Sequence, residues 1–275
     1  MIVLPQAWME DLEGKDPFET LFAVKGEVYR EQQARRTLRF SYRGKYYFGK
    51  FHSGVGWRQV CKDLLQLRMP VLGAQNEWRA IRRLTELGIP TTSLIGYGTR
   101  GRNPARRRSF VITEELSHTV SLEDFCRDWR KAPPDPALKR ALIVKVAEIA
   151  RILHESGMNH RDFYICHFLL DISRGAAGLD PRRLRLYLID LHRVQIRRRT
   201  PARWRIKDLA SLCFSSMDAG LSWRDRLRFV RIYRNRPLRE VMAEERLFWR
   251  RVNRRAAALY REFQRKHPGP AQAAD

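Results

Sequence analysis

Two aspartates stand at positions where carboxylates could do chemistry. Asp162 lies in a short predicted loop directly after His160 and Arg161, and Asp190 lies in a predicted strand over residues 184–191. A carboxylate can take up a proton from a reacting group, and its oxygens are the ligands that Mg²⁺ prefers. A His-Arg-Asp tripeptide also recurs by chance. Its weight therefore depends on whether further charged groups precede it in a suitable order.

Two such groups lie upstream, each in an element that could position it. Residues 27–51 alternate aromatic and aliphatic side chains around a glycine-containing turn, which predicts antiparallel strands, and Lys50 lies in the last of them. A helix is predicted to begin near Asn76, with Glu77 in its first turn. Taken alone, Lys50 is a solvent-facing strand lysine and Glu77 is a carboxylate stabilised by a helix N-terminus.

A long amphipathic helix leads directly into the Asp162 loop. It ends at Gly157, and its apolar residues are spaced four, four, three and four positions apart, which predicts one continuous apolar stripe. These residues are Leu138, Leu142, Val146, Ile149 and Leu153.

Composition limits the class of protein and of partner. With 275 residues, 44% of them hydrophobic, the chain can bury a full core. Its 54 Lys and Arg against 30 Asp and Glu give a formal net charge of +24, which attracts nucleic acid, an anionic membrane face, or a phosphorylated or acidic substrate. We expect no signal peptide, and the four scattered cysteines suit the reduced cytosol.

The order Lys50, Glu77, Asp162, Asp190 resembles that of the protein-kinase-like phosphotransferases. This resemblance implies an α+β, two-lobed fold with a small antiparallel β lobe and a mostly helical large lobe. The expected boundaries are an irregular lead-in over 1–24, the small lobe over 25–116 with an inserted helical segment at 53–75, the large lobe over 117–265, and a disordered tail over 266–275.

A narrower resemblance rests on four runs of the sequence. Residues 71–80, 160–164, 189–193 and 207–210 are similar to the lipopolysaccharide core heptose(I) kinase family. This similarity implies transfer of the γ-phosphate of ATP, with Mg²⁺, to a heptose hydroxyl of the lipopolysaccharide inner core. It also implies a peripheral position on the cytoplasmic face of the inner membrane.

The resemblance assigns the transfer chemistry residue by residue. Asp162, with Arg161 beside it, would accept the proton of the sugar hydroxyl or orient that hydroxyl. Lys50 would steady the ATP phosphates and Glu77 would steady Lys50. Asp190 would bind Mg²⁺.

Further roles follow from the same resemblance. The backbone of Glu115 and Leu116, after the last small-lobe strand, would receive adenine. His160 would support the loop structurally. Asp208 would hold the loop through backbone hydrogen bonds, although a carboxylate near the start of a helix explains it nearly as well.

Three features depart from the protein-kinase pattern. The loop over 31–36 contains no glycine, so arginine would replace part of the phosphate cradle. His167 stands five positions after Asp162, where protein kinases have asparagine; a second metal there is doubtful, and a packed or hydrogen-bonded histidine is an equal alternative. Only 18 positions separate Asp190 from Asp208, which leaves no room for a long activation loop and argues against a protein substrate.

The charge agrees with an anionic partner. The inner core carries sugar carboxylates and its lipid anchor carries phosphates, so a basic large lobe would dock this glycolipid and the anionic inner-membrane surface. An acidic protein such as acyl carrier protein is a further expected partner, and nucleic acid is disfavoured.

Other functions stay open at this stage. A basic nucleic-acid-binding protein explains the charge but leaves the ordered Lys, Glu and Asp set without a role. A kinase-fold binding protein without transfer activity is a second alternative, and a kinase acting on another small molecule or on protein tyrosine is a third. A metal site made of His160, Cys166, His167 and His192 matches no structural zinc spacing.

Overall fold

The computed structural model describes residues 1–32, 34–54, 56–65, 73–103 and 105–267. They form two compact units. Unit 1 contains residues 1–117 together with 191–193, which contact helix α4 (Gln75–Glu86). Unit 2 contains residues 118–190 and the chain from 194 onward. A small antiparallel sheet dominates unit 1 and helices dominate unit 2, so the expected α+β class is confirmed.

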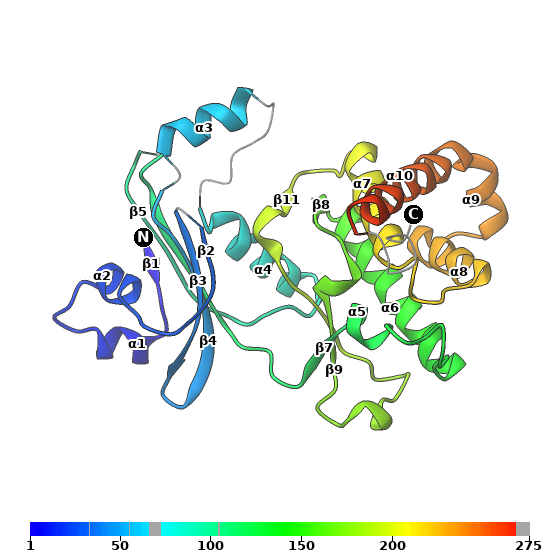
Figure 1. Cartoon of the computed structure of the whole chain (residues 1–275). Coiled ribbons are helices and arrows are strands. Elements are labelled where there is room, and N and C mark those ends of the chain that lie inside the picture. The colour runs from blue at the N-terminus through cyan, green and yellow to red at the C-terminus, as the bar shows by residue number, and fades with distance from the viewer. Residues whose placement is uncertain (33, 55, 66–72, 104, 268–275) are drawn as a thin grey trace, which may run out of the picture. The chain divides into compact units, whose positions relative to one another are not determined.

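The sheet of unit 1 has six strands, with every neighbouring pair antiparallel. Figure 1 shows these strands side by side in blue to green. Their order is β1-β5-β6-β4-β3-β2. The strands are β1 (Ile2–Val3), β2 (Glu27–Gln32), β3 (Arg35–Tyr42), β4 (Lys45–His52), β5 (Leu94–Arg100) and β6 (Arg108–Glu114).

The lead-in over residues 1–24 is ordered, so the expectation of an irregular segment was wrong. It contributes β1 as the sixth strand and the helices α1 (Gln6–Asp11) and α2 (Pro17–Phe22). Its aromatic residues Trp8 and Phe18 are buried in one cluster with Phe40 and Phe110 of the sheet. Burial of a large aromatic side chain contributes roughly 1.5–3 kcal/mol, enough to order a segment that shows no periodicity of its own.

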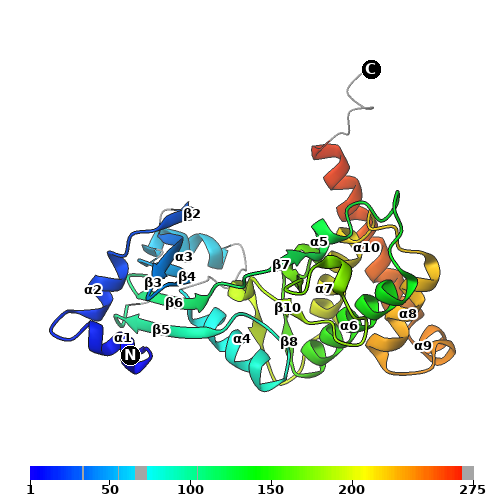
Figure 2. The ribbon, with the colours of Figure 1, turned by 90° about the horizontal axis from the view of Figure 1, so that it is seen from below.

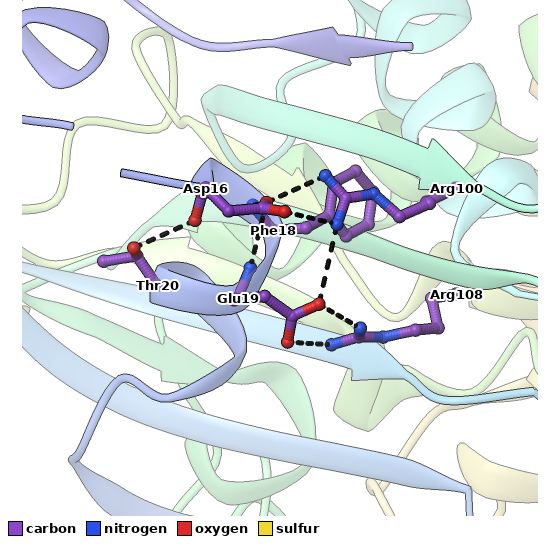
Figure 3. A network of polar contacts seen from close by, with 6 residues as sticks. All are labelled: Asp16, Phe18, Glu19, Thr20, Arg100 and Arg108. Carbon is purple, nitrogen blue, oxygen red and sulfur yellow. Dashed lines mark hydrogen bonds and ion pairs between the residues drawn. The ribbon is translucent and has the colours of Figure 1, made fainter. Parts of the chain in front are cut away.

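A polar network also ties the lead-in to the sheet (Figure 3). Asp16 caps α2 by accepting hydrogen bonds from the backbone N–H groups of Phe18 and Glu19 at 2.9 and 3.3 Å. Its carboxylate also pairs with Arg100 of β5 at 2.7 Å, while Glu19 pairs with Arg108 of β6 at 2.6 Å. The Arg100 guanidinium lowers the pKa of Asp16 to about 2. Arg100 and Arg108 therefore anchor the lead-in to the sheet through ion pairs.

Helix α4 begins at Gln75, with Ala74 as its N-cap in place of Asn76. The Ala74 backbone N–H donates to Ser109 Oγ of β6 at 3.0 Å, so a tertiary contact positions the helix start. Its buried face includes Trp78, which stacks on Tyr97 of β5 with ring centroids 4.7 Å apart. Within the predicted segment 53–75, helix α3 (Gly56–Leu65) is present, and residues 66–72 lie outside the described residues.

Unit 2 is built around helices, which Figure 2 shows from below. They are α5 (Leu122–Phe125), α6 (Pro136–Glu155), α7 (Ala202–Ser215), α8 (Trp223–Arg234), α9 (Leu238–Glu244) and α10 (Arg246–Lys266). The strands β7 (Thr119–Ser121), β9 (Phe168–Asp171) and β10 (Leu186–Leu188) form one antiparallel sheet, and β8 (Met158–Asn159) pairs with β11 (Gln195–Ile196). No helix in the described ranges has the length and apolarity needed to cross a bilayer.

Helix α6 confirms the stripe read from the sequence. Leu142, Val146 and Leu153 are buried, and α6 packs against α8. Gly157 follows it at φ 78°, where a Cβ would lie 1.8 Å from the Arg197 carbonyl oxygen, so glycine is required there. Glu245 separates α9 from α10, as the C-cap of the first helix and the N-cap of the second.

His52, the last residue of β4, predicts a pH dependence of stability. It is 5% exposed, and its Nε2 has no hydrogen-bond partner among the described residues. Burial lowers its pKa to about 4, and the positive charges of Arg35, Lys50 and His192 act in the same direction. Between pH 6.5 and 4 the unfolded chain therefore binds this proton and the folded chain does not. The free energy of unfolding is therefore not reduced by this group above pH ~6.5, and it falls as the pH drops toward 4.

We expect the free energy of unfolding to lose about 3 kcal/mol from His52 over that interval. Urea unfolding of the wild type and of His52→Gln at pH 7.5 and pH 4.5 measures it. The difference between the two pH values should shrink in the variant, whatever its absolute stability. An equal pH dependence in both proteins contradicts the prediction.

Candidate active site

In unit 1 the structure brings Lys50 and Glu77 together. Lys50 Nζ on β4 forms an ion pair with Glu77 Oε1 in the first turn of α4. Both side chains are largely buried, and Glu77 is the deeper of the two. The second Glu77 oxygen is buried without a hydrogen-bond partner among the described residues. A buried ion pair with a spare carboxylate oxygen holds the ammonium group in one place, which is what a phosphate-binding lysine requires.

Glu115 and Leu116 follow β6 directly. The Glu115 carboxylate is clamped by Arg39, which donates from Nε and Nη2 at 2.8 and 2.9 Å. Its backbone N–H donates to the Tyr46 carbonyl oxygen at 3.1 Å. Glu115 could therefore offer a nucleotide its carbonyl oxygen, but its N–H is already used. Arg39 was not predicted, because a strand arginine carries no signal that shows its partner.

In unit 2 the predicted loop is held from behind by Asp208 of α7. Asp208 is fully buried and accepts hydrogen bonds from the backbone N–H of His160 at 2.6 Å and of Arg161 at 2.9 Å. The sequence left open whether this aspartate merely stabilises a helix start. Its contacts instead match the backbone support that the resemblance implied. Asp162, the next residue, is half-buried.

The backbone is strained at Arg161, directly before Asp162, and at Asp190. Arg161 has φ 75° and Asp190 has φ 59°, the left-handed region that residues with a Cβ rarely adopt. Each such residue costs on the order of 1 kcal/mol or more and persists only where its surroundings hold it. The hydrogen bond from Arg161 N–H to Asp208 is one such restraint. Asp208 therefore supports a strained, preorganised loop.

His160 links the loop to the residue before Asp190. Its ring is fully buried, and Nε2 lies 3.0 Å from the Ile189 carbonyl oxygen. Burial lowers the pKa of His160, so the ring is neutral. A neutral ring can meet this acceptor only by donating from Nε2, which fixes the tautomer. His160 thus has the structural position that the sequence assigned to it.

His167 lies between the two aspartates. Its Nδ1 is 2.7 Å from the Asp162 carbonyl oxygen, and its Nε2 is 3.5 Å from Asp190 Oδ2. Because the carbonyl oxygen only accepts, Nδ1 carries the proton, and a neutral ring presents the Nε2 lone pair toward Asp190. Nε2 and the carboxylate could share a divalent cation. Imidazole is a poor ligand for Mg²⁺, however, so the residues fit a Mg²⁺ ion held mainly by Asp190.

Few protein ligands are available for that ion. Among the described residues no group of three His, Cys, Asp or Glu side chains could hold a metal. This agrees with the usual binding of Mg²⁺ through one or two carboxylates together with substrate phosphates.

One residue behind the loop was not predicted. His154, near the end of α6, is 4% exposed; its Nε2 lies 3.3 Å from Asp208 Oδ2 and its Nδ1 lies 2.9 Å from the Tyr233 hydroxyl. The signal was present in the sequence, since a histidine directly follows Leu153 of the apolar stripe. Its partners are too distant along the chain for that pattern to identify them.

Comparison with known proteins agrees with this geometry. A family model described as the lipopolysaccharide kinase (Kdo/WaaP) family matches residues 19–233. The lipopolysaccharide core heptose(I) kinase WaaP of Pseudomonas aeruginosa PAO1 is 50% identical over 264 residues, covering 96% of this chain and 97% of the relative. The enzyme of the same name from Escherichia coli K12 is 48% identical over 253 residues, covering 92% and 94%.

A solved structure described as WaaP in complex with acyl carrier protein superposes with a TM-score of 0.83 at 46% identity. The match covers 94% of this chain and 99% of that one. The resemblance drawn from the sequence runs is confirmed, and so is the enzyme class: the chain is a phosphotransferase. From its motifs, fold and relatives together, this chain belongs to the lipopolysaccharide kinase (Kdo/WaaP) family.

Proposed function

We propose that this chain transfers the γ-phosphate of ATP to a heptose hydroxyl of the lipopolysaccharide inner core. One observation carries the proposal: the loop at Asp162 is held by Asp208 in a defined conformation, and phosphoryl transfer depends on such positioning. The buried Lys50–Glu77 pair supplies the cation that ATP phosphates need. The relatives named above, at 48–50% identity, are heptose(I) kinases, and this supports a heptose hydroxyl as the acceptor of the phosphate.

In this proposal each side chain has one task. Lys50, steadied by Glu77, binds phosphate oxygens of ATP. Asp162 takes up the proton of the sugar hydroxyl. The hydroxyl oxygen then bonds to the γ-phosphorus while the bond between that phosphorus and the oxygen that leaves with ADP breaks. Asp190 would hold Mg²⁺, which when bound neutralises charge on the phosphates. Positioning and charge neutralisation provide most of the catalysis, so no covalent intermediate on the protein is needed.

We also propose that the enzyme works at the cytoplasmic face of the inner membrane as a peripheral protein. The net charge of +24 supports this, because each Lys or Arg near an anionic bilayer contributes about 1 kcal/mol of binding. Sugar carboxylates and lipid phosphates of the substrate would meet the same basic surface.

Acyl carrier protein is the proposed protein partner. A similar protein was solved in complex with it, and a strongly basic chain suits an acidic partner. Unit 2 contains an apolar cavity among Leu122, Val146, Leu209, Phe229 and Trp249, in which the centre of a water molecule could occupy about 140 Å³. An apolar cavity of roughly this size holds a small hydrocarbon, so it could take part of an acyl chain.

The decisive assay supplies γ-labelled ATP and Mg²⁺ with two acceptors in separate tubes, dephosphorylated inner-core lipopolysaccharide and casein. Asp162→Ala serves as the blank. Label in the glycolipid that disappears with the variant supports the proposal. Label in casein alone favours a protein kinase. Label in neither rejects the enzyme as described and favours a basic binding protein.

Glu77→Gln is expected to reduce kcat/KM for ATP by about 10- to 100-fold, since the lost interaction is a buried, charge-assisted one of roughly 1.5–3 kcal/mol. The amide keeps the shape of the side chain but no longer pairs as an ion with Lys50. Steady-state kinetics with varied ATP measures the loss. Glu86→Gln is the matched control, because Glu86 lies exposed on the same helix and pairs with the nearby Arg83 at 3.0 Å. Equal kinetics for both variants contradict the role of Glu77.

A further inference from the structure

A second, polar cavity lies in unit 2, apart from the apolar one. The centre of a water molecule can occupy about 190 Å³ within it. One ordered water needs roughly 10–15 Å³ on this measure, so the cavity has room for a polyatomic ion. Four arginines line it, from α6, α7, α8 and the segment before α7, together with a single carboxylate from Glu155. The arginines are Arg151, Arg199, Arg205 and Arg234.

The charges around this cavity are not balanced. Arg151 pairs with Glu155 at 3.2 Å, and Arg234 pairs with Glu245. Arg199 and Arg205 have no carboxylate partner among the ion pairs of the described residues. The cavity wall thus concentrates positive charge where part of the guanidinium surface is already removed from water.

Hydrogen-bond donors are also left over. The Nε atoms of Arg151, Arg205 and Arg234 are buried and have no acceptor among the described residues. Buried donors without acceptors cost roughly 1–3 kcal/mol each, so such a cluster favours a ligand that brings acceptors close to these guanidinium groups. A phosphate group offers several oxygens in the geometry that guanidinium groups bind best.

The wall of the cavity is connected to the Asp162 loop by buried polar contacts. His154 and Tyr233 line the cavity and are hydrogen-bonded to each other at 2.9 Å. Burial raises the pKa of the Tyr233 hydroxyl, and Arg205 beside it opposes that rise. His154 Nε2 in turn meets Asp208 at 3.3 Å, and Asp208 accepts the backbone N–H of His160 and Arg161. The path from Arg205 to the loop passes through three side chains.

We propose that this cavity binds a phosphate group and that binding stabilises the Asp162 loop through Tyr233, His154 and Asp208. A phosphate oxygen near Arg205 would redirect that guanidinium, and the hydrogen bonds of Tyr233 and His154 would respond. Free phosphate and a lipid phosphate headgroup share this chemistry. Only the description of the loop as catalytic rests on the proposed function; the binding site does not.

The test uses the full-length protein with a non-hydrolysable ATP analogue bound, so that phosphate cannot report on the nucleotide site. Calorimetric titration with inorganic phosphate measures affinity, and hydrogen exchange measures protection of the amides of His160 and Arg161. Arg199→Gln is the first variant, because Arg199 is exposed and its loss does not endanger folding. Arg198→Gln is its control, since Arg198 is exposed next to it and does not line the cavity.

We expect phosphate to bind the wild type and Arg198→Gln alike and about tenfold more weakly to Arg199→Gln, because one charge-assisted contact is lost. Phosphate should slow exchange of the two amides in the wild type, and this effect should be lost in Arg205→Gln. Equal weakening by Arg198→Gln and Arg199→Gln overturns the site in favour of diffuse attraction. Binding that leaves both amides unchanged overturns the coupling to the loop.

The source of the phosphate is decided by competition. Phosphatidylcholine vesicles with and without phosphatidic acid are added to the phosphate-bound protein. Displacement by the phosphatidic acid vesicles in the wild type and in Arg198→Gln assigns the site to a headgroup, provided that direct binding of these vesicles, measured without phosphate, is at least tenfold weaker for Arg199→Gln. Retention of bound phosphate in the presence of either vesicle assigns it to soluble phosphate. Absence of any binding at millimolar phosphate and with both vesicles rejects the proposal.

Discussion

Asp162→Asn is expected to reduce the rate of phosphoryl transfer by about 10³-fold while leaving the fold unchanged, since a positioned proton acceptor contributes roughly 10²- to 10⁴-fold. The substitution removes the charge and the basicity of the side chain only. Two contacts of the loop use the Asp162 backbone and do not depend on its carboxylate: the carbonyl oxygen accepts from the Tyr164 N–H at 3.1 Å and lies 2.7 Å from His167 Nδ1. Those contacts persist in the variant.

Single-turnover transfer of label to the glycolipid measures this loss, and thermal unfolding of the same preparation checks the fold. Asp180→Asn is the matched control in unit 2, because Asp180 lies at the chain surface and caps a turn by accepting from Arg182 N–H at 2.9 Å. Transfer by Asp162→Asn within tenfold of the wild type would remove Asp162 from the reaction. An equal loss in both variants would point to a general effect of charge.

Asp208→Asn is expected to have the largest effect on stability, lowering the free energy of unfolding by about 3 kcal/mol. The carboxylate is fully buried and uses both oxygens, one for His160 N–H and one for Arg161 N–H, with His154 Nε2 beside the first. An amide has one oxygen, so its NH₂ group would face a backbone donor. If the NH₂ group faces His160, a buried N–H loses its acceptor; if it faces Arg161, the strained φ of Arg161 loses that restraint.

Urea unfolding compares this variant with Asp218→Asn, whose carboxylate is 60% exposed and pairs with Arg130 at 2.9 Å. The control should change stability by less than ~1 kcal/mol, as exposed ion pairs do. We also expect transfer by Asp208→Asn to fall, with faster exchange of the His160 and Arg161 amides. A stability within 1 kcal/mol of the wild type would show that Asp208 acts as an ordinary helix residue.

Several elements were predictable because their signal is local. The four-four-three-four spacing of apolar residues predicts the buried face of α6 without knowledge of its packing partner. Gly157 follows the helix because its positive φ is one that glycine adopts readily. The order Lys50, Glu77, Asp162, Asp190 and four short runs identified the family, since a chemical task constrains residue types at fixed places in the chain. The pairing of Lys50 with Glu77 followed from the resemblance.

Other features depend on partners distant in the chain, and no local pattern specifies them. Strand β1 forms because Ile2 and Val3 pair with the edge of β5. The lead-in helices are held because Trp8 and Phe18 pack into the aromatic cluster of the sheet. Helix α4 begins where Ser109 meets Ala74. Each partner is an ordinary residue in its own neighbourhood.

The same division applies to the site. The sequence by itself determined which groups could act, Lys50, Glu77, Asp162 and Asp190, because their types and order are chemical requirements. Only the tertiary structure decided which residues support the site and what lies around it. Examples are the hydrogen bonds of Arg39 to Glu115, the contact of Asp208 with the Asp162 loop, and the polar cavity lined by four arginines beside His154. These depend on close approach of groups that lie far apart in the chain. Distances of 2.6–3.3 Å between such groups are set by packing, and packing is a property of the whole fold.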